Sequence, residues 1–366
     1  MIIGHGGNIH QLARQLACQP EDIIDMSSNM NPLGPPPGLM DHLRARLETI
    51  FVLPEADADR MTNAAADWHQ VRPERILGGN GTTQFIYTLP RALKTKKALI
   101  VAPTYADYAD ACRMEAVSWD YLFTRAADDF IPDMETLDKI AAGYDTIFIC
   151  NPNNPTGRLI PADGLTWICR NHPETRFIID ESYLPFVLNG DKESLVRMDL
   201  DNVIILSSMS KIFRIPGLRV GFLIGAEPVI HKLAAYAMPW SVNSLAQEAI
   251  CYLLTQPEMA RRFIGSGRDF VAQEKKRFMA AFQDVPGIRF YPSETGFFLG
   301  ELKNMTAGTV WTEMARRRFL IRDCSNFRGL SNRFIRISLK TGAENETAAQ
   351  ALEQILRNFS SPQVRI

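Results

Sequence analysis

The chain has 366 residues, of which 46% are hydrophobic, a length that suggests about two domains with a large core. Its formal net charge of −1 and the lack of long runs of one sign argue against a nucleic-acid partner. Apolar runs are far shorter than the ~18 residues that span a bilayer and no secretory signal is visible, so we expect a cytoplasmic protein with no membrane partner.

The predicted elements divide the chain into three parts. Residues 1–30 form an N-terminal arm, which is followed by an irregular Pro/Gly-rich stretch at 31–38. Residues 31–244 alternate helices with short apolar strands, which indicates an α/β domain with a sheet covered by helices. Residues 245–366 contain longer charged helices and shorter strands, which indicates a smaller α+β domain.

The individual elements follow from their apolar periodicity. Nearly continuous apolar runs predict parallel strands at 98–101, 146–150, 177–180, 203–207 and 220–224. Helices are expected at 83–93 and 105–114. In the smaller domain we expect helices at 245–255, 259–282 and 346–359, and strands at 297–302 and 334–339.

Polar residues follow several of these strands, at the sheet edge where ligands of α/β proteins bind. The turn Gly78–Thr83 is rich in glycine and opens a helix, so it is either a phosphate cradle or a plain tight turn. Asn154 lies in an Asn/Pro/Gly string in which prolines could fix its amide toward a ligand, or which is simply a turn.

The next two strands end at Asp180 and just before Lys211. A carboxylate at the end of a buried strand needs a cationic partner, unless it caps the next helix. A lysine just past a buried strand can be a Schiff-base nucleophile. Tyr183 follows Asp180, hydroxyls flank Lys211, and Arg219 comes soon after. Together with the glycine-rich turn, these residues form the set that holds pyridoxal phosphate.

This set resembles the fold-type I pyridoxal-phosphate enzymes of the aminotransferase superfamily, close to the histidinol-phosphate aminotransferases. The resemblance implies a large domain with a mostly parallel seven-stranded sheet, a small C-terminal domain and a homodimer. Lys211 would bind the cofactor covalently and move protons, and Asp180 would hold the pyridinium nitrogen. Asn154 and Tyr183 would bind the ring hydroxyl. Lys211, Asp180 and Tyr183 are therefore the implied catalytic residues.

The same resemblance implies further cofactor and substrate contacts. Tyr105 would stack on the cofactor ring, and Arg336 would grip the substrate carboxylate as a fork. The implied contacts to the cofactor phosphate are Gly81, Thr82, Ser208, Ser210 and Arg219.

Strings at residues 5–8, 28–34, 238–243 and 320–327 are similar to the threonine-phosphate decarboxylases. That similarity implies conversion of L-threonine O-3-phosphate to (R)-1-aminopropan-2-yl phosphate for the cobalamin nucleotide loop, with L-serine O-phosphate open as a second substrate. The N-terminal arm and Arg322 would clamp the substrate phosphate. The implied substrate contacts are His5, Gly6, Gly7, Asn8, Asn31, Leu33, Gly34, Asn154, Arg322 and Arg336.

Other interpretations remain at this stage. A histidinol-phosphate-type aminotransferase is the main alternative, because the cofactor residues are shared. The order S-x-x-K, S-x-N, K-T-G at Ser208, Ser241 and Lys340 also matches penicillin-interacting serine enzymes, although a strand leads into Ser208. A ligand-sensing regulator would need a DNA-binding module, for which the N-terminal arm is too short.

Two further features bear on the site. Where the family usually has Tyr-Pro-Asp or Tyr-Pro-Glu, with a tyrosine that reaches the neighbouring subunit's cofactor phosphate, this chain has Leu53-Pro54-Glu55. The six cysteines are scattered without a C-x-x-C pair, so we predict reduced thiols and no metal site.

Overall fold

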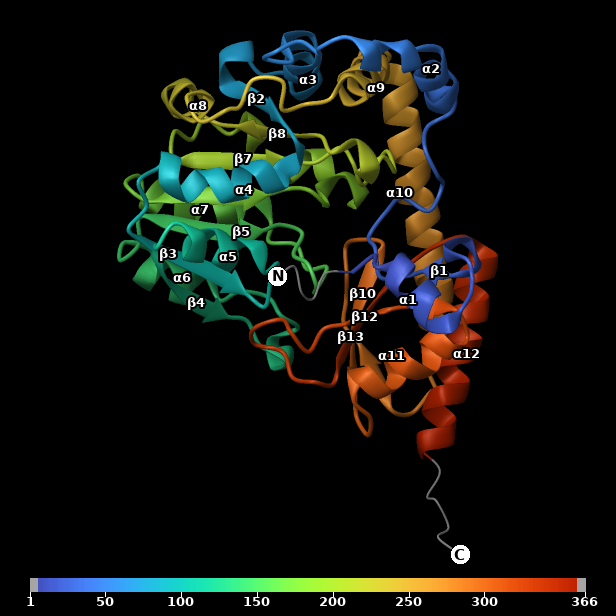
Figure 1. The fold of residues 1–366 in the computed structure, drawn as a ribbon. Coiled ribbons are helices and arrows are strands. Elements are labelled where there is room, and N and C mark those ends of the chain that lie inside the picture. The colour runs from blue at the N-terminus through green and yellow to red at the C-terminus, as the bar shows by residue number, and fades with distance from the viewer. Residues whose placement is uncertain (1–5, 361–366) are drawn as a thin grey trace, which may run out of the picture.

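The computed structural model describes residues 6–360 and shows two layered regions joined by a long helix (Figure 1). The larger region is built on a seven-stranded sheet with the order β2-β8-β7-β6-β5-β3-β4. In this spatial order the strands are β2 (Ile76–Gly79), β8 (Gly221–Ile224), β7 (Val203–Ser207), β6 (Arg176–Asp180), β5 (Thr146–Cys150), β3 (Lys97–Ala102) and β4 (Ser118–Phe123). The prediction of a mostly parallel α/β sheet is confirmed.

The parallel direction expected for the strand at 220–224 is wrong. β8 runs antiparallel to both of its neighbours, β2 and β7. A parallel neighbour needs a crossover, usually a helix, whereas β7 and β8 are joined only by turns and the short 3₁₀ segment Pro216–Leu218. The chain therefore reverses after the polar residues that follow β7.

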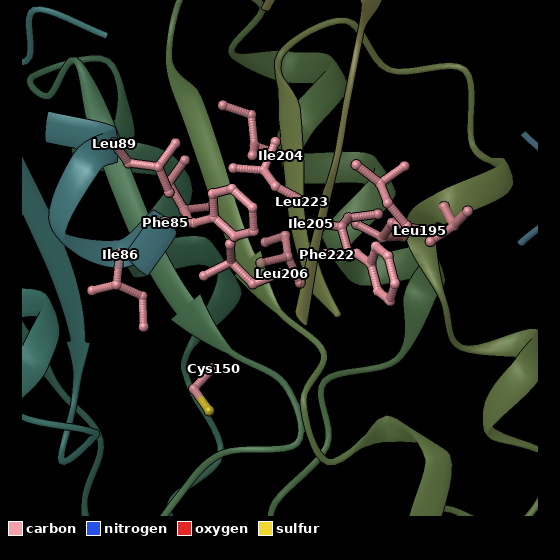
Figure 2. Close-up of a cluster of buried hydrophobic side chains, with 14 of the residues drawn as sticks. Phe85, Ile86, Leu89, Cys150, Leu195, Ile204, Ile205, Leu206, Phe222 and Leu223 are labelled. Carbon is pink, nitrogen blue, oxygen red and sulfur yellow. The ribbon is translucent and has the colours of Figure 1, made fainter. Parts of the chain in front are cut away.

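Helices pack against this sheet. They are α3 (Asp59–His69), α4 (Gly81–Ala92), α5 (Asp107–Met114), α6 (Met134–Ala141), α7 (Ala162–Asn171), α8 (Glu227–Ala234) and α9 (Ser244–Leu254). Figure 2 shows part of the core, in which Phe85 and Leu89 of α4 lie beside Ile204 and Leu206 of β7. Every residue of β7 is buried, as expected for a strand covered on both faces.

The smaller region has its own core and a four-stranded antiparallel sheet with the order β12-β13-β10-β9. Its elements are β9 (Ile288–Phe290), β10 (Phe297–Leu302), α11 (Ala307–Arg316), β12 (Arg322–Asp323), β13 (Phe334–Ser338) and α12 (Gly342–Ser360). The predicted α+β character of this region is present.

The N-terminal segment packs on the smaller region. Its elements are α1 (Ile9–Leu16) and β1 (Ile24–Asp25), whereas α2 (Leu39–Ala45) packs on α9 and belongs to the core of the larger region. β1 pairs in parallel with β11 (Phe319–Leu320), and Leu12 and Ile23 share a cluster with Leu320. The N-terminal arm and the smaller region are thus in direct contact, although the larger region lies between them in sequence.

The predicted boundary near residue 244 falls at the start of α9, before the helix that serves both regions. α9 packs on α2 and α3, and its buried residues belong to the core of the larger region. In α10 (Pro257–Ala280), Phe263 and Ile264 join that core, whereas Val271 and Phe278 join the core of the smaller region. Within residues 6–360, no helix combines the length and the apolar character needed to cross a membrane.

Candidate active site

A cavity of about 580 Å³ lies at the carboxyl ends of the parallel strands, where they face the smaller region. Its walls come from segments far apart in sequence, including the ends of β3 and β7, the start of α4, and β12 and β13. The predicted site residues that line it are Gly6, Gly81, Thr82, Tyr105, Asn154, Tyr183, Ser208, Ser210, Lys211, Arg219, Arg322 and Arg336. All of the predicted strand-end residues except Asp180 therefore converge on one space.

One end of the cavity is shaped for an anion. α4 begins at Gly81, which has φ +76°, and a Cβ there would stand 2.9 Å from Nη2 of Arg219. A Cβ on Gly221 would likewise stand 2.7 Å from the backbone nitrogen of Thr82. Only glycine permits these approaches, which bring a guanidinium to the helix N-terminus with its free N–H groups. The donor set fits a phosphate group.

Asp180 is buried beside the site but is not among the residues that line the cavity. Its side chain is 6% exposed, and its oxygens accept hydrogen bonds from the Tyr108 hydroxyl at 2.7 Å and from the Ser182 backbone nitrogen at 3.0 Å. Across the described chain, Asp180 makes no ion pair. A buried carboxylate held only by neutral donors has room for a cation, so the site fits a protonated pyridine nitrogen.

Tyr108 was missed by the sequence reasoning, although it lies only three residues after Tyr105. The two rings meet edge to face, with centroids 5.9 Å apart. Burial, together with the nearby Asp107 carboxylate, raises the pKa of Tyr105 above its ordinary value, so this ring stays neutral. A neutral aromatic ring at the cavity wall suits stacking on a cofactor ring.

Lys211 lies in the turn after β7, with Nζ 5.1 Å from the centroid of the Tyr183 ring. Its backbone oxygen accepts a hydrogen bond from the Asn31 backbone nitrogen at 3.0 Å, which ties this turn to the segment after the N-terminal arm. The Ser210 hydroxyl donates to the Val220 carbonyl at 2.9 Å, so the turn is also fixed from within. The amine thus has a defined position in the cavity.

Two arginines face each other across the strands of the smaller region. In the β12–β13 register, Arg322 lies directly opposite Arg336, and both line the cavity. Like charges placed opposite each other on a sheet are destabilising, unless an anion compensates them. Burial lowers the pKa of Arg322, and neighbouring Arg336 contributes in the same direction. The pair therefore favours negatively charged groups on a ligand.

Arg336 is only 5% exposed, and one of its guanidinium nitrogens makes no hydrogen bond within the described residues. Its terminal nitrogens donate to Oδ1 of Asn154 and to the Ser27 carbonyl, and its Nε has no hydrogen-bond partner in the described residues. Arg322 instead donates to the Asp323 carbonyl and to Oδ1 of Asn326, each at 2.8 Å. A ligand carboxylate would meet a guanidinium with bonding capacity left at Arg336.

Several predicted substrate contacts do not line the cavity. His5 lies outside the described residues. The Asn8 side chain caps α1, and the Gly7 backbone nitrogen donates to Oγ of Ser27. Asn31 is fully buried. Its side chain donates to the Ile212 carbonyl and accepts from the backbone nitrogen of Leu33. Leu33 and Gly34 also lie outside the lining.

Other lining residues were not predicted. They include Ser27, Ser28, Asn29, Thr83, Arg113 and Arg328. Asn29 lies in the same string as Asn31, but nothing in the string indicates which of the two amides faces the cavity.

The motifs of a penicillin-interacting enzyme do not meet at one site. Ser208 and Lys211 line the cavity, but Asn243 and Lys340 do not. The Asn243 side chain caps α9 by accepting from the Ala246 backbone nitrogen, and Lys340 donates to the Ser28 carbonyl. The three motifs therefore do not form one catalytic site.

Comparisons with known proteins agree with this geometry. The sequence profile of the family described as aminotransferase class I and II matches residues 21–355. The threonine-phosphate decarboxylase of Salmonella typhimurium is 31% identical over 360 residues, covering 97% of each chain. The histidinol-phosphate aminotransferase of Methanocaldococcus jannaschii is 28% identical over 355 residues, covering 96% of this chain and 94% of the relative.

A solved structure gives a similar result. The L-threonine-O-3-phosphate decarboxylase of Porphyromonas gingivalis superposes with a TM-score of 0.81 at 32% identity, covering 92% of this chain and 100% of the other. The likeness thus extends over nearly the whole chain. It includes relatives described as decarboxylases and relatives described as aminotransferases.

Proposed function

Since the chain belongs to the aminotransferase class I and II family, it is a pyridoxal-phosphate-dependent enzyme of fold type I, and we propose that it decarboxylates L-threonine O-3-phosphate. The product would be (R)-1-aminopropan-2-yl phosphate, the side-chain precursor of the cobalamin nucleotide loop. The proposal is supported by the decarboxylase relatives and by the chemistry of the cavity.

The observation that carries the proposal is the pair Arg322 and Arg336, opposite each other at the cavity wall. An amino acid O-phosphate has two anionic groups and uses both arginines at once. We assign the substrate phosphate to Arg322 and the substrate carboxylate to Arg336, whose Nε has no other partner in the described residues. Holding both ends would fix the orientation of the bonds at the substrate Cα.

The remaining residues supply the environment for loss of carbon dioxide. Bound pyridoxal phosphate supplies an electron sink for the electrons of the broken bond. Asp180 would hold a protonated ring nitrogen, and Tyr183 and Asn154 would bind the ring hydroxyl. Lys211 would hold the cofactor between turnovers, and its amine would deliver a proton to Cα after carbon dioxide leaves.

The activity is tested by incubating the purified holoenzyme with L-threonine O-3-phosphate. We expect carbon dioxide and aminopropanol phosphate in equal amounts, without any requirement for 2-oxoglutarate. A histidinol-phosphate-type aminotransferase is the alternative, since its relatives share the cofactor residues. Amino transfer to 2-oxoglutarate without carbon dioxide release would establish that alternative and contradict decarboxylation.

We also propose that two copies of the chain associate through an exposed apolar patch, formed by Leu47, Ile50, Phe51, Val52, Leu53, Met238 and Trp240. Phe51 is 81% exposed and Leu53 73%, and the Trp240 backbone nitrogen donates to the Ala56 carbonyl, which joins the two segments. Contiguous apolar patches of this kind are typical of interfaces. Leu53 stands where the family has its cross-subunit tyrosine, so this position contacts the second copy through packing alone.

Charges in this patch are expected to separate the copies. The double variant F51D/L53D should sediment as a single chain, because two carboxylates would have to be desolvated at the interface. Leu188→Asp is the matched control, since Leu188 is also exposed but lies outside the patch. A dimer that survives the double substitution would exclude this patch as the interface.

A further inference from the structure

Three buried side chains form a hydrogen-bonded chain that runs from the smaller region to the cavity. The Ser338 hydroxyl donates to Oδ1 of Asn29 at 2.5 Å, and Nδ2 of Asn29 donates to the Tyr183 hydroxyl at 3.1 Å. Ser338 is 1% exposed, and Asn29 and Tyr183 are each 7% exposed. The three side chains are therefore largely shielded from bulk solvent, and the orientation of each depends on the next.

The chain of bonds determines the direction of the Tyr183 proton. A phenol hydroxyl has one proton to donate and accepts bonds on its oxygen. Because Asn29 already donates to that oxygen, the Tyr183 proton must point to another acceptor. Both residues line the cavity, together with Lys211. An acceptor inside the cavity is thus the natural partner of the Tyr183 proton.

Asn29 is itself held by the strand that carries Arg336. Alternate residues of β13 and its extension bind consecutive residues of the N-terminal arm: Arg336 donates to the Ser27 carbonyl, Ser338 to Asn29, and Lys340 to the Ser28 carbonyl. Residues at every second position share one face of a strand. The orientation of the Asn29 amide is therefore fixed from the smaller region, two residues from Arg336.

We propose that Asn29 is a positioning residue which, oriented by Ser338, keeps the Tyr183 hydroxyl as a hydrogen-bond donor to the ring oxygen of bound pyridoxal phosphate. The inference deepens the proposed function because it rests on the assignment of Tyr183 to that oxygen. A donor to the anionic ring oxygen stabilises the more negatively charged state of the lysine-bound cofactor. Loss of the donor should therefore raise the pH at which that cofactor loses its proton.

The test is a pH titration of the visible absorbance of the holoenzyme without substrate. Tyr183→Phe should raise the midpoint by about one pH unit or more, the size expected for a hydrogen bond to a charged group. Asn29→Leu, which is uncharged and similar in size, should raise it in the same direction. Ser338→Ala should raise the midpoint by a smaller amount. It tests the same chain of hydrogen bonds if Asn29→Leu does not fold.

Lys340→Met is the matched control. It removes an anchor of the N-terminal arm beside Asn29 but leaves the chain from Ser338 to Tyr183 intact. We expect its midpoint to equal that of the wild type. If it rises as much as that of Asn29→Leu, the position of the arm and not the Asn29 amide controls Tyr183, and the inference is wrong.

The remaining outcomes distinguish a failure of this inference from a failure of the proposed function. A midpoint that moves in Tyr183→Phe but in neither Asn29→Leu nor Ser338→Ala overturns the role of Asn29 and leaves the role of Tyr183. A midpoint unmoved in Tyr183→Phe shows that Tyr183 does not donate to the ring, and the inference fails with it. Decarboxylation is measured separately by carbon dioxide release, so neither result decides the substrate.

Discussion

Replacing Lys211 by alanine is expected to abolish both the absorbance of the lysine-bound cofactor and turnover. The amine lies in the cavity at the end of β7, and it is assigned both the covalent bond to the cofactor and the proton delivered to Cα. General acid–base catalysis alone contributes about 10²- to 10⁴-fold, so we expect carbon dioxide release to fall by at least about 10³-fold. Stopped-flow absorbance and a carbon dioxide assay measure the two effects.

The control for this variant is Lys232→Ala, a change of an exposed lysine on α8 that does not line the cavity. It should retain the absorbance and the rate of the wild type. Turnover retained by Lys211→Ala would show that another group binds the cofactor.

Substitutions of the two opposing arginines are expected to have different signatures. Arg322→Met should reduce the preference for L-threonine O-3-phosphate over L-threonine, because the phosphate contact is lost. Arg336→Met should lower kcat/KM for both substrates in proportion, because both carry the carboxylate. Truncating one partner of a buried charged hydrogen bond costs about 2–5 kcal/mol, so each loss should reach about 10²-fold.

The comparison is made with kcat/KM for the two substrates in each variant. Arg316→Met serves as the control, since this arginine is exposed on α11 and pairs with Glu313 outside the cavity. If Arg322→Met kept the full preference for the phosphorylated substrate, the phosphate would be held elsewhere, and the assignment of Arg322 would be wrong.

Much of the fold could be predicted from local pattern alone. The run at 203–207 is entirely apolar apart from its last residue and becomes β7, buried along its whole length. Such a run has few alternatives, because exposing it would leave a large apolar surface in water. The direction of β8 was not predictable in the same way. An apolar run records burial but not which way its neighbours point, and here the short connection from β7 decided the direction.

The site also combines residues that local pattern predicts with residues that only tertiary contacts place. Asp180 ends a buried strand and Lys211 lies in the turn after another. The carboxyl ends of parallel strands share one edge of a sheet, so the placement of both residues at that edge follows from the sequence. Asn29 and Asn31 are two residues apart in one string, yet only Asn29 lines the cavity, while the Asn31 amide is bound to the Ile212 carbonyl. That choice depends on contacts with segments about 180 residues or more away, which no local pattern records.

The sequence by itself therefore determined the α/β class, the strand-end residues of the cofactor site and the family resemblance, because these depend on periodicity and on residues next to strand ends. Only the tertiary structure decided that Arg322 and Arg336 stand opposite each other and that Tyr108 bonds to Asp180. It also decided that Ser338 orients Asn29 toward Tyr183. The Arg322–Arg336 pair forms within the smaller region and the Tyr108–Asp180 bond within the larger region, because strand pairing and helix packing bring these residues together. The bonds of Asn29 exist only after both regions and the N-terminal arm have packed together.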